Sequence, residues 1–497
     1  MMQWRAVVLL LAVVFSSTTT AVVRSPEGRG QVLIYPYFLV QPFNGDEGIQ
    51  TLFSLVNHSD QGKAVKLRFR EALNGREVLA MNVYLGPRDV WAGAIIADSR
   101  DSAAQLITQD PTCTVPALGS LVGSGGTFRG QAFSVGDFTG PRVDSGPQAP
   151  SRTHSGYVEA IEMGTVIEGS ATDQWLRRPV RQRDCQPFLQ AWLLPDGVWV
   201  GDPQRDLASP SGGLSGTISL FEGPRSTSYQ MEAVALEEFS VVIQHTGPHI
   251  PLPDLSSAVT DPARRVVHSS VQQGSRVVRS EWPPERAVDA VSAALAVETL
   301  EAEYALEPGI DGRSEWLLTM PTKRFYTDPA LSAAVQSPFD PSVAAQRCSY
   351  GFGGRSYDRE GATSFIDYSP PPPPIRLCNS VEVVRVGSSL AQPVLPGGQR
   401  VQITNVGFHS AGHLELIFPA TGYDRTAHLS RPALGGERYA GVPVVATRLQ
   451  RFVNNSARPG VSTIYGTAEP VRSRARCLKS VELVQPGEFR TSPCLAE

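Results

Sequence analysis

Apolar and polar residues alternate over long stretches of the first hundred residues. In residues 64–71, three basic side chains alternate with three apolar ones, and a second alternating run follows at 78–85. A period of two places successive side chains on opposite faces of a β-strand, so one face is expected in a core and the other in water. The two runs are separated by Asn74-Gly75, a dipeptide typical of hairpin turns. The pattern therefore predicts antiparallel β-structure.

Strand signals of the same kind extend along most of the chain. They are predicted at 30–37, 50–57, 89–96, 156–166, 188–194, 216–221, 229–239, 381–386, 400–405, 414–418 and 442–452. The 45 glycines and 40 prolines are frequent enough to separate many short strands by turns. These elements favour a mainly β protein, with an immunoglobulin-like β-sandwich in the N-terminal region and a second β-rich unit in the C-terminal region.

One helix is predicted within this β pattern, over residues 285–306. Pro283 and Pro284 precede it, and Pro308-Gly309 follow it. Proline suits the first turn of a helix, and a proline-glycine pair ends one. Several apolar side chains fall on one side of the segment, so we expect the helix to pack on a sheet.

Length and composition indicate a folded chain of several domains. The chain has 497 residues, of which 41% are hydrophobic and 19% charged, enough apolar matter to fill more than one core. The expected regions are a signal peptide (1–21), a β-sandwich region (22–250), a mixed region that contains the helix and the strand of Trp316 (251–369), a polyproline spacer (370–374) and a β-rich region (375–497).

The N-terminus has the three parts of a secretory signal peptide. Arg5 supplies a positive charge, residues 6–15 an apolar run, and Thr19-x-Ala21 a cleavage site, so the mature chain is expected to begin near Val22. No later segment is long and apolar enough to span a bilayer. The net charge of −4 is too small to favour a nucleic-acid partner. We therefore expect a periplasmic or extracellular protein without a membrane span.

An even number of cysteines in an exported chain indicates disulfides. The six are Cys113, Cys185, Cys348, Cys378, Cys477 and Cys494. Many connectivities are possible, and we favour pairing between neighbours in the sequence: Cys113 with Cys185, Cys348 with Cys378, and Cys477 with Cys494. The chain has no CxxC motif and no Cys-His cluster at ligand spacing, so a cysteine metal site is not expected.

Several phrases of the chain resemble those of one family of exported proteobacterial proteins. They stand at 30–37, 54–57, 62–69, 84–91 and 315–326, with two shorter ones at 441–444 and 464–466. The likeness covers most of the predicted mature chain and implies one shared architecture. That family has no established activity, ligand or active site, so the resemblance implies no function.

No motif of a known catalytic class is present. The nucleophile elbow Gly-x-Ser-x-Gly, the zinc motif His-Glu-x-x-His, the phosphate loop and the EF-hand spacing are all absent. His409 and His413 are spaced for one face of a helix, but the glycines around them argue against a helix there. Acidic turns at 44–47 and 196–202 leave a weak calcium site open. We predict no catalytic residue, no cofactor and no metal ligand.

A group of basic and aromatic residues is the best candidate for a binding surface. A predicted strand of alternating apolar and polar residues ends there in a turn at 321–323, and a partner could reach the exposed side chains of that turn. The alternative is a core strand that leads into an ordinary surface turn. The candidate residues are Trp316, Lys323, Arg324 and Tyr326.

These observations favour a protein of the cell envelope or the extracellular space that acts by binding or by structural association. Its partner would be a protein or a glycan. The alternative is a secreted hydrolase directed at polysaccharide, with an active site that no motif marks. A deep groove lined by two carboxylates and aromatic rings would favour the hydrolase, whereas flat faces and exposed sheet edges would favour binding.

Overall fold

The structure is a computed structural model that describes most of residues 20–494. Not described within that range are 45–46, 124–125, 145, 180–183, 333, 335, 340–348, 364–374, 388–391, 396–400, 405–408, 419–427, 459–460 and 486–487. Most of the predicted signal peptide, the polyproline spacer, Cys348 and half of the acidic turn at 44–47 therefore lie outside the described residues. Strands dominate the described part and helices are few and short, so the predicted mainly β class is confirmed.

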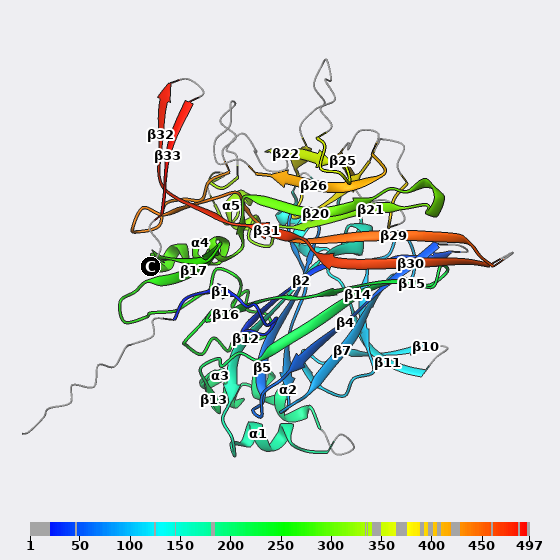
Figure 1. Cartoon of the computed structure of the whole chain (residues 1–497). Helices are drawn as coiled ribbons and strands as arrows, with labels where there is room; N and C mark the ends of the chain where they lie inside the picture. Colours follow the sequence, from blue (N-terminus) through cyan, green and yellow to red (C-terminus); the bar gives the residue numbers. More distant parts are fainter. Residues whose placement is uncertain are drawn as a thin grey trace, which may run out of the picture.

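Two eight-stranded sheets make up the N-terminal half (Figure 1). Sheet 1 has the order β1 (Val23–Arg24), β16 (Val234–Glu237), β2 (Val32–Leu39), β12 (Ser155–Val166), β5 (Lys63–Glu71), β6 (Glu77–Leu85) and β9 (Cys113–Val115), with β13 (Leu207–Ala208) beside β12. Sheet 2 has the order β10 (Gly119–Gly123), β11 (Gly126–Ala132), β8 (Gln105–Thr108), β7 (Val90–Ile96), β4 (Glu47–Asn57), β14 (Leu214–Glu222) and β15 (Thr227–Glu232), with β3 (Gln41–Asn44) beside β4. All pairings within both sheets are antiparallel.

One hydrophobic cluster fills the space between these two sheets. Phe53 of β4 meets Phe69 of β5 edge to face, with ring centroids 5.6 Å apart, and Trp91 of β7 packs beside them. These residues occupy the apolar positions of the alternating runs, which explains why those runs predict the strands correctly. The finer immunoglobulin-like topology stays a prediction.

Two five-stranded sheets form most of the C-terminal part. Sheet 3 has the order β23 (Ile375–Leu377), β22 (Ser349–Tyr357), β26 (Ala411–Ile417), β20 (Thr299–Ala305) and β31 (Arg472–Arg474). Sheet 4 has the order β25 (Val401–Thr404), β24 (Val381–Val386), β21 (Arg313–Thr319), β29 (Val445–Arg458) and β30 (Val461–Pro470). Trp316 of β21 and Leu414 of β26 belong to the core between sheets 3 and 4, whereas Leu317 of β21 belongs to the core of sheets 1 and 2. Sheet 4 is therefore buried on both faces at β21.

Smaller elements complete the fold. The remaining strands are the hairpin β17 (Val267–Gln273) and β18 (Arg276–Trp282), the pair β19 (Ala296–Val297) and β28 (Val442–Pro443), and a sheet of β27 (Arg438–Ala440), β32 (Arg476–Gln485) and β33 (Glu488–Pro493). The α-helices are α1 (Ala171–Leu176), α2 (Gln186–Leu193), α3 (Val198–Gly201), α4 (Ala287–Ala294) and α5 (Arg324–Thr327). No helix in the described part of the chain is long and apolar enough to cross a membrane.

The predicted helix over 285–306 is wrong in its second half. α4 covers only Ala287–Ala294, and strand β20 occupies Thr299–Ala305. In β20 the buried Leu300 and Tyr304 alternate with the less buried Glu301 and Glu303, and the strand pairs with β26 and β31. The alternation of buried and less buried residues, together with cross-strand pairing, therefore decides the structure of this segment. The helical spacing of its apolar residues does not.

The strand predicted at 188–194 is also wrong, because α2 covers most of it. Phe188 and Ala191, three residues apart, are both buried on one side of this helix, and Pro187 lies in its first turn. Three-residue spacing of buried side chains is helical, and proline is favoured at this end of a helix.

The basic face of β5 is buried, although the alternation places it in water. Lys66, Arg68 and Arg70 are at most 1% exposed. The segment that follows β16 covers this face: Lys66 Nζ donates to the Gly247 carbonyl at 2.8 Å, and Arg68 Nε donates to the Pro253 carbonyl at 3.0 Å. Buried cations require such partners. Alternation thus identifies the strand but not the layer that covers its polar face.

Disulfides join the pairs predicted from sequence order wherever both partners are described. Cys113 is bonded to Cys185, and Cys477 is bonded to Cys494. Cys378 is also disulfide-bonded, while Cys348 lies outside the described residues. Such bonds are compatible with an exported protein.

Candidate functional site

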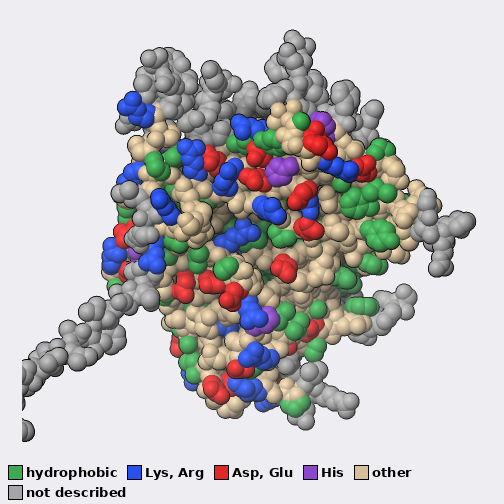
Figure 2. Space-filling model, viewed as in Figure 1, with side chains coloured by type: hydrophobic (Ala, Val, Ile, Leu, Met, Phe, Trp, Pro, Cys, Tyr) green, Lys and Arg blue, Asp and Glu red, His purple; other side chains and the backbone are tan. Residues whose placement is uncertain are grey.

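A hollow of about 520 Å³ opens where the N-terminal strand meets the C-terminal sheets. Its walls are formed by β1, β17, β20 and β31 and by the segment that connects α4 to β19. Figure 2 shows a hollow among basic side chains in the region of these elements. Its volume lies within the roughly 300–1,000 Å³ of small-molecule sites. The hollow is thus large enough to hold a small ligand.

The floor of the hollow is aliphatic and its rim is basic. Val271, Leu295 and Val297 line it and are at most 5% exposed. The charged residues that line it are Arg24, Arg472, Arg474 and Glu301. No aromatic ring is among its lining residues. This combination suits a ligand with an aliphatic part and an anionic group.

The three arginines differ in whether an acidic partner neutralises them. Arg474 pairs with Glu301 at 3.0 Å. Arg24 and Arg472 are accessible to solvent but make no hydrogen bond and no ion pair with any described residue. The protein that surrounds Arg24 in the hollow lowers the pKa of its guanidinium by desolvation. Arg472 lies directly opposite Glu301 across the β20–β31 pair but forms no ion pair with it. At longer range Arg472 helps to lower the pKa of Glu303, after the larger effect of a backbone hydrogen bond. Two guanidinium groups therefore remain available for an anion.

The outward face of sheet 3 continues from this rim with ionisable side chains. Glu301 of β20 stands directly opposite Glu415 of β26, and His413 lies two residues before Glu415 on the same face. The ligand atoms of these three residues lie within 4.8 Å of one another, and all three side chains are half-buried. His413 and Glu415 make no hydrogen bond or ion pair with described residues, although the His413 ring lies 6.0 Å from that of Tyr357.

Three of the four residues predicted to form a binding surface are buried and Arg324 is mostly buried, so the predicted exposure is wrong. Trp316 and Tyr326 are at most 1% exposed and Lys323 is 5% exposed. The Arg324 side chain is 13% exposed and binds Asp254 at 2.8 Å. The cause is that layers of sheet cover β21 on both faces, and its following turn is buried with it.

The polar groups of Lys323 and Tyr326 have internal partners. Lys323 Nζ donates to the carbonyls of Cys378 and Asn379 at 2.7 and 3.1 Å. Tyr326 Oη donates to Asp289 at 2.6 Å. Burial lowers the pKa of Lys323 to about 8, against the opposite effect of Glu382. These groups hold the interior together and do not face a ligand.

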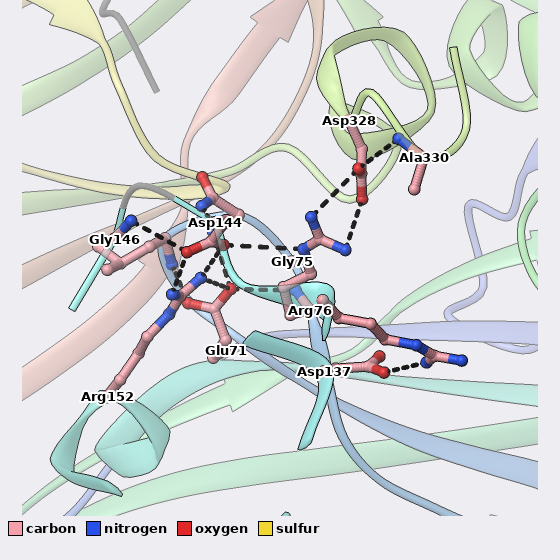
Figure 3. Close-up of polar contacts among 12 residues, drawn as sticks. Glu71, Gly75, Arg76, Asp137, Asp144, Gly146, Arg152, Asp328 and Ala330 are labelled. Carbon is pink, nitrogen blue, oxygen red and sulfur yellow. Dashed lines mark hydrogen bonds and ion pairs between the residues drawn. The ribbon is translucent and has the colours of Figure 1, made fainter. Parts of the chain in front are cut away.

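A network of ion pairs fixes the same region to the β5–β6 hairpin (Figure 3). Arg152 binds Asp144 at 2.7 Å and Glu71 at 3.1 Å, while Arg76 binds Asp328 at 3.2 Å. The adjoining cavity measures about 40 Å³, room for a few water molecules at most. Because its charges are paired and its cavity is small, this network is structural.

The low pKa of Lys323 predicts a pH dependence of stability. Between about pH 8 and 10.5, this lysine is neutral in the folded protein and protonated in the unfolded chain. The unfolded state then binds more protons, so the free energy of unfolding rises with pH in this window, by up to roughly 3 kcal/mol from this group. Relative to Lys323→Met, the wild type should therefore gain stability as pH rises from 8 to 10.

Urea unfolding at several pH values measures this difference. Lys479→Met serves as the control, because Lys479 is 47% exposed and exposed charges contribute little to folding stability. A stability difference between wild type and Lys323→Met that does not change with pH would show that the Lys323 ammonium has its ordinary pKa.

Sequence reasoning missed the residues of the hollow and the sheet 3 face. Arg24 and Arg472 are more than four hundred residues apart in the chain. The signal that could have found part of this site is His413-x-Glu415, since alternate residues of a strand share a face. Comparisons with protein-family models, with curated proteins and with solved structures give no match for this chain.

Proposed function

We propose that this is an exported binding protein that holds a small organic anion in the hollow lined by Arg24 and Arg472. The proposal rests on one observation. Two guanidinium groups that form no ion pair with any described residue line a hollow whose floor is aliphatic. Guanidinium groups bind carboxylates and phosphates by charge-assisted hydrogen bonds. An apolar part of the same ligand would be buried against the aliphatic floor, and the removal of its surface from water would favour binding.

The composition of the hollow favours binding over hydrolysis. Glu301 is the one carboxylate among its lining residues, and that carboxylate is paired with Arg474. Glycoside hydrolysis uses two carboxyl groups on either side of the bond that is cleaved. Sugar rings also stack on aromatic side chains in many sites, and this hollow is lined by none. A small aliphatic anion therefore fits better than a polysaccharide chain.

Calorimetric titration of the purified protein with three six-carbon probes tests this proposal. Hexanoate and hexyl phosphate should bind at least about tenfold more tightly than hexanol, because only the anions use the guanidinium groups. Arg24→Gln and Arg472→Gln should each weaken binding of the anions by roughly tenfold.

Arg29→Gln is the matched control, because it removes the same charge from an exposed residue that does not line the hollow. It should leave binding unchanged. The proposal fails if hexanol binds as tightly as hexanoate, or if Arg29→Gln weakens anion binding as much as the two hollow variants do.

A further inference from the structure

Two carboxylates face each other on neighbouring strands of sheet 3. Glu301 and Glu415 are direct cross-strand partners in the β20–β26 pair. Like charges in this position destabilise a sheet unless a cation lies between them. Glu301 has Arg474 at 3.0 Å, but Arg474 is 63% exposed, and exposed ion pairs are weak. Glu415 has no ion pair with any described residue. Arg355 of β22 lies opposite Glu415, and Arg472 of β31 lies opposite Glu301, but neither arginine forms an ion pair with its carboxylate. The two carboxylates are therefore placed to share a bound cation.

His413 completes a set of three ligands at the same place. Its side chain lies on the face that carries Glu415, and the three ligand atoms are within 4.8 Å of one another. Zn²⁺ binds imidazole nitrogen and carboxylate oxygen at about 2.0–2.2 Å, so its ligand atoms stand roughly 3.3 Å apart. Small rotations of half-buried side chains can close the remaining difference.

We propose that Glu301, His413 and Glu415 bind a divalent transition metal ion, with Zn²⁺ as the best fit. Imidazole together with carboxylates suits Zn²⁺, whereas Ca²⁺ and Mg²⁺ prefer oxygen ligands alone. Three protein ligands leave a fourth position of the ion open for water or an anion. The site shares Glu301 with the hollow, but the metal ion does not depend on the organic anion.

Rigid placement on strands supports the site. Glu301 belongs to β20 between β26 and β31, while His413 and Glu415 belong to β26 between β20 and β22. Each strand is thus held on both sides by backbone hydrogen bonds. Ligands on paired strands are positioned before the metal arrives, which lowers the cost of ordering them.

Titration of the tag-free, EDTA-treated protein with ZnCl₂ alone tests the proposal. We expect one tightly bound Zn²⁺ ion and a rise in the melting temperature, with a much smaller response to MgCl₂ or CaCl₂. His413→Ala and Glu415→Gln should each weaken Zn²⁺ binding by at least about tenfold.

Two comparisons separate loss of the site from loss of the fold. Glu415→Gln removes the repulsion from Glu301 together with the attraction of Arg355, so without metal it should melt close to the wild type. His409→Ala is the control, because His409 lies close in the chain but outside the cluster, and it should keep the Zn²⁺ response.

The proposal is overturned if the wild type shows no Zn²⁺ binding, or binds it no more tightly than His413→Ala. It is also overturned if His409→Ala abolishes the response, since that would place the ion elsewhere. Anion titration in EDTA tests the hollow separately, so failure of either site can be told from failure of the other.

Discussion

Replacing Glu162 with leucine is expected to lower the free energy of unfolding by about 3–5 kcal/mol. Glu162 of β12 and Lys63 of β5 are both fully buried, and their charged atoms lie 2.7 Å apart. Glu162 also accepts the backbone N–H groups of Ser211 and Gly212 at 3.0 and 2.7 Å. Removal of the carboxylate leaves a buried ammonium without its counterion and two backbone N–H groups without an acceptor.

The double variant Lys63→Met, Glu162→Leu separates loss of the pair from loss of packing. It removes both charges together, so it should recover a large part of the stability that either single variant loses. Urea unfolding followed by tryptophan fluorescence measures all three variants.

The exposed pair of Arg88 and Asp60 is the control, since these side chains are 62% and 83% exposed. Asp60→Asn should leave the unfolding midpoint unchanged. If the single variants of the buried pair are as stable as Asp60→Asn, then Lys63 and Glu162 are not buried in the folded protein.

Loss of the bond between Cys113 and Cys185 is expected to cost roughly 4 kcal/mol, because it closes a long loop in the unfolded chain. The two cysteines are 72 residues apart in the sequence. The bond also ties the start of α2 to β9 at the edge of sheet 1, beside a cluster that contains Phe188 and Trp199. The double variant Cys113→Ala, Cys185→Ala should therefore unfold at much lower urea concentration than the wild type.

The bond between Cys477 and Cys494 provides an internal comparison. Its cysteines are only 17 residues apart, so its removal should cost roughly 3 kcal/mol, less than removal of the first bond. If the order of the two effects is reversed, loop closure is not the main source of the stabilisation.

The sequence pattern predicts strands well where an apolar face meets a core. β5 and β6 lie where alternation places them, because Leu67 and Met81 both face the cluster between sheets 1 and 2. The same pattern gives the wrong environment for Lys66, since alternation cannot show that a later segment covers the polar face. It also cannot mark the change from helix α4 to strand β20, because cross-strand partners of β20 are more than a hundred residues away.

The candidate site was largely beyond reach of the sequence for the same reason. Arg24, Glu301 and Arg472 meet only because β1, β20 and β31 are brought together by tertiary contacts. The basic and aromatic residues of 316–326 are conspicuous in the sequence, yet they serve the interior. Charged side chains that are close together in the sequence are thus not necessarily exposed to solvent when sheets pack on both faces of their strand.

A crystal structure of the protein with hexyl phosphate tests whether Arg24 and Arg472 hold the anionic group of a bound ligand. The phosphate group should lie within hydrogen-bonding distance of Arg24 and Arg472, with the hexyl chain over Val271 and Leu295. Hexyl phosphate bound elsewhere at saturating concentration, with only solvent beside these arginines, would contradict this placement.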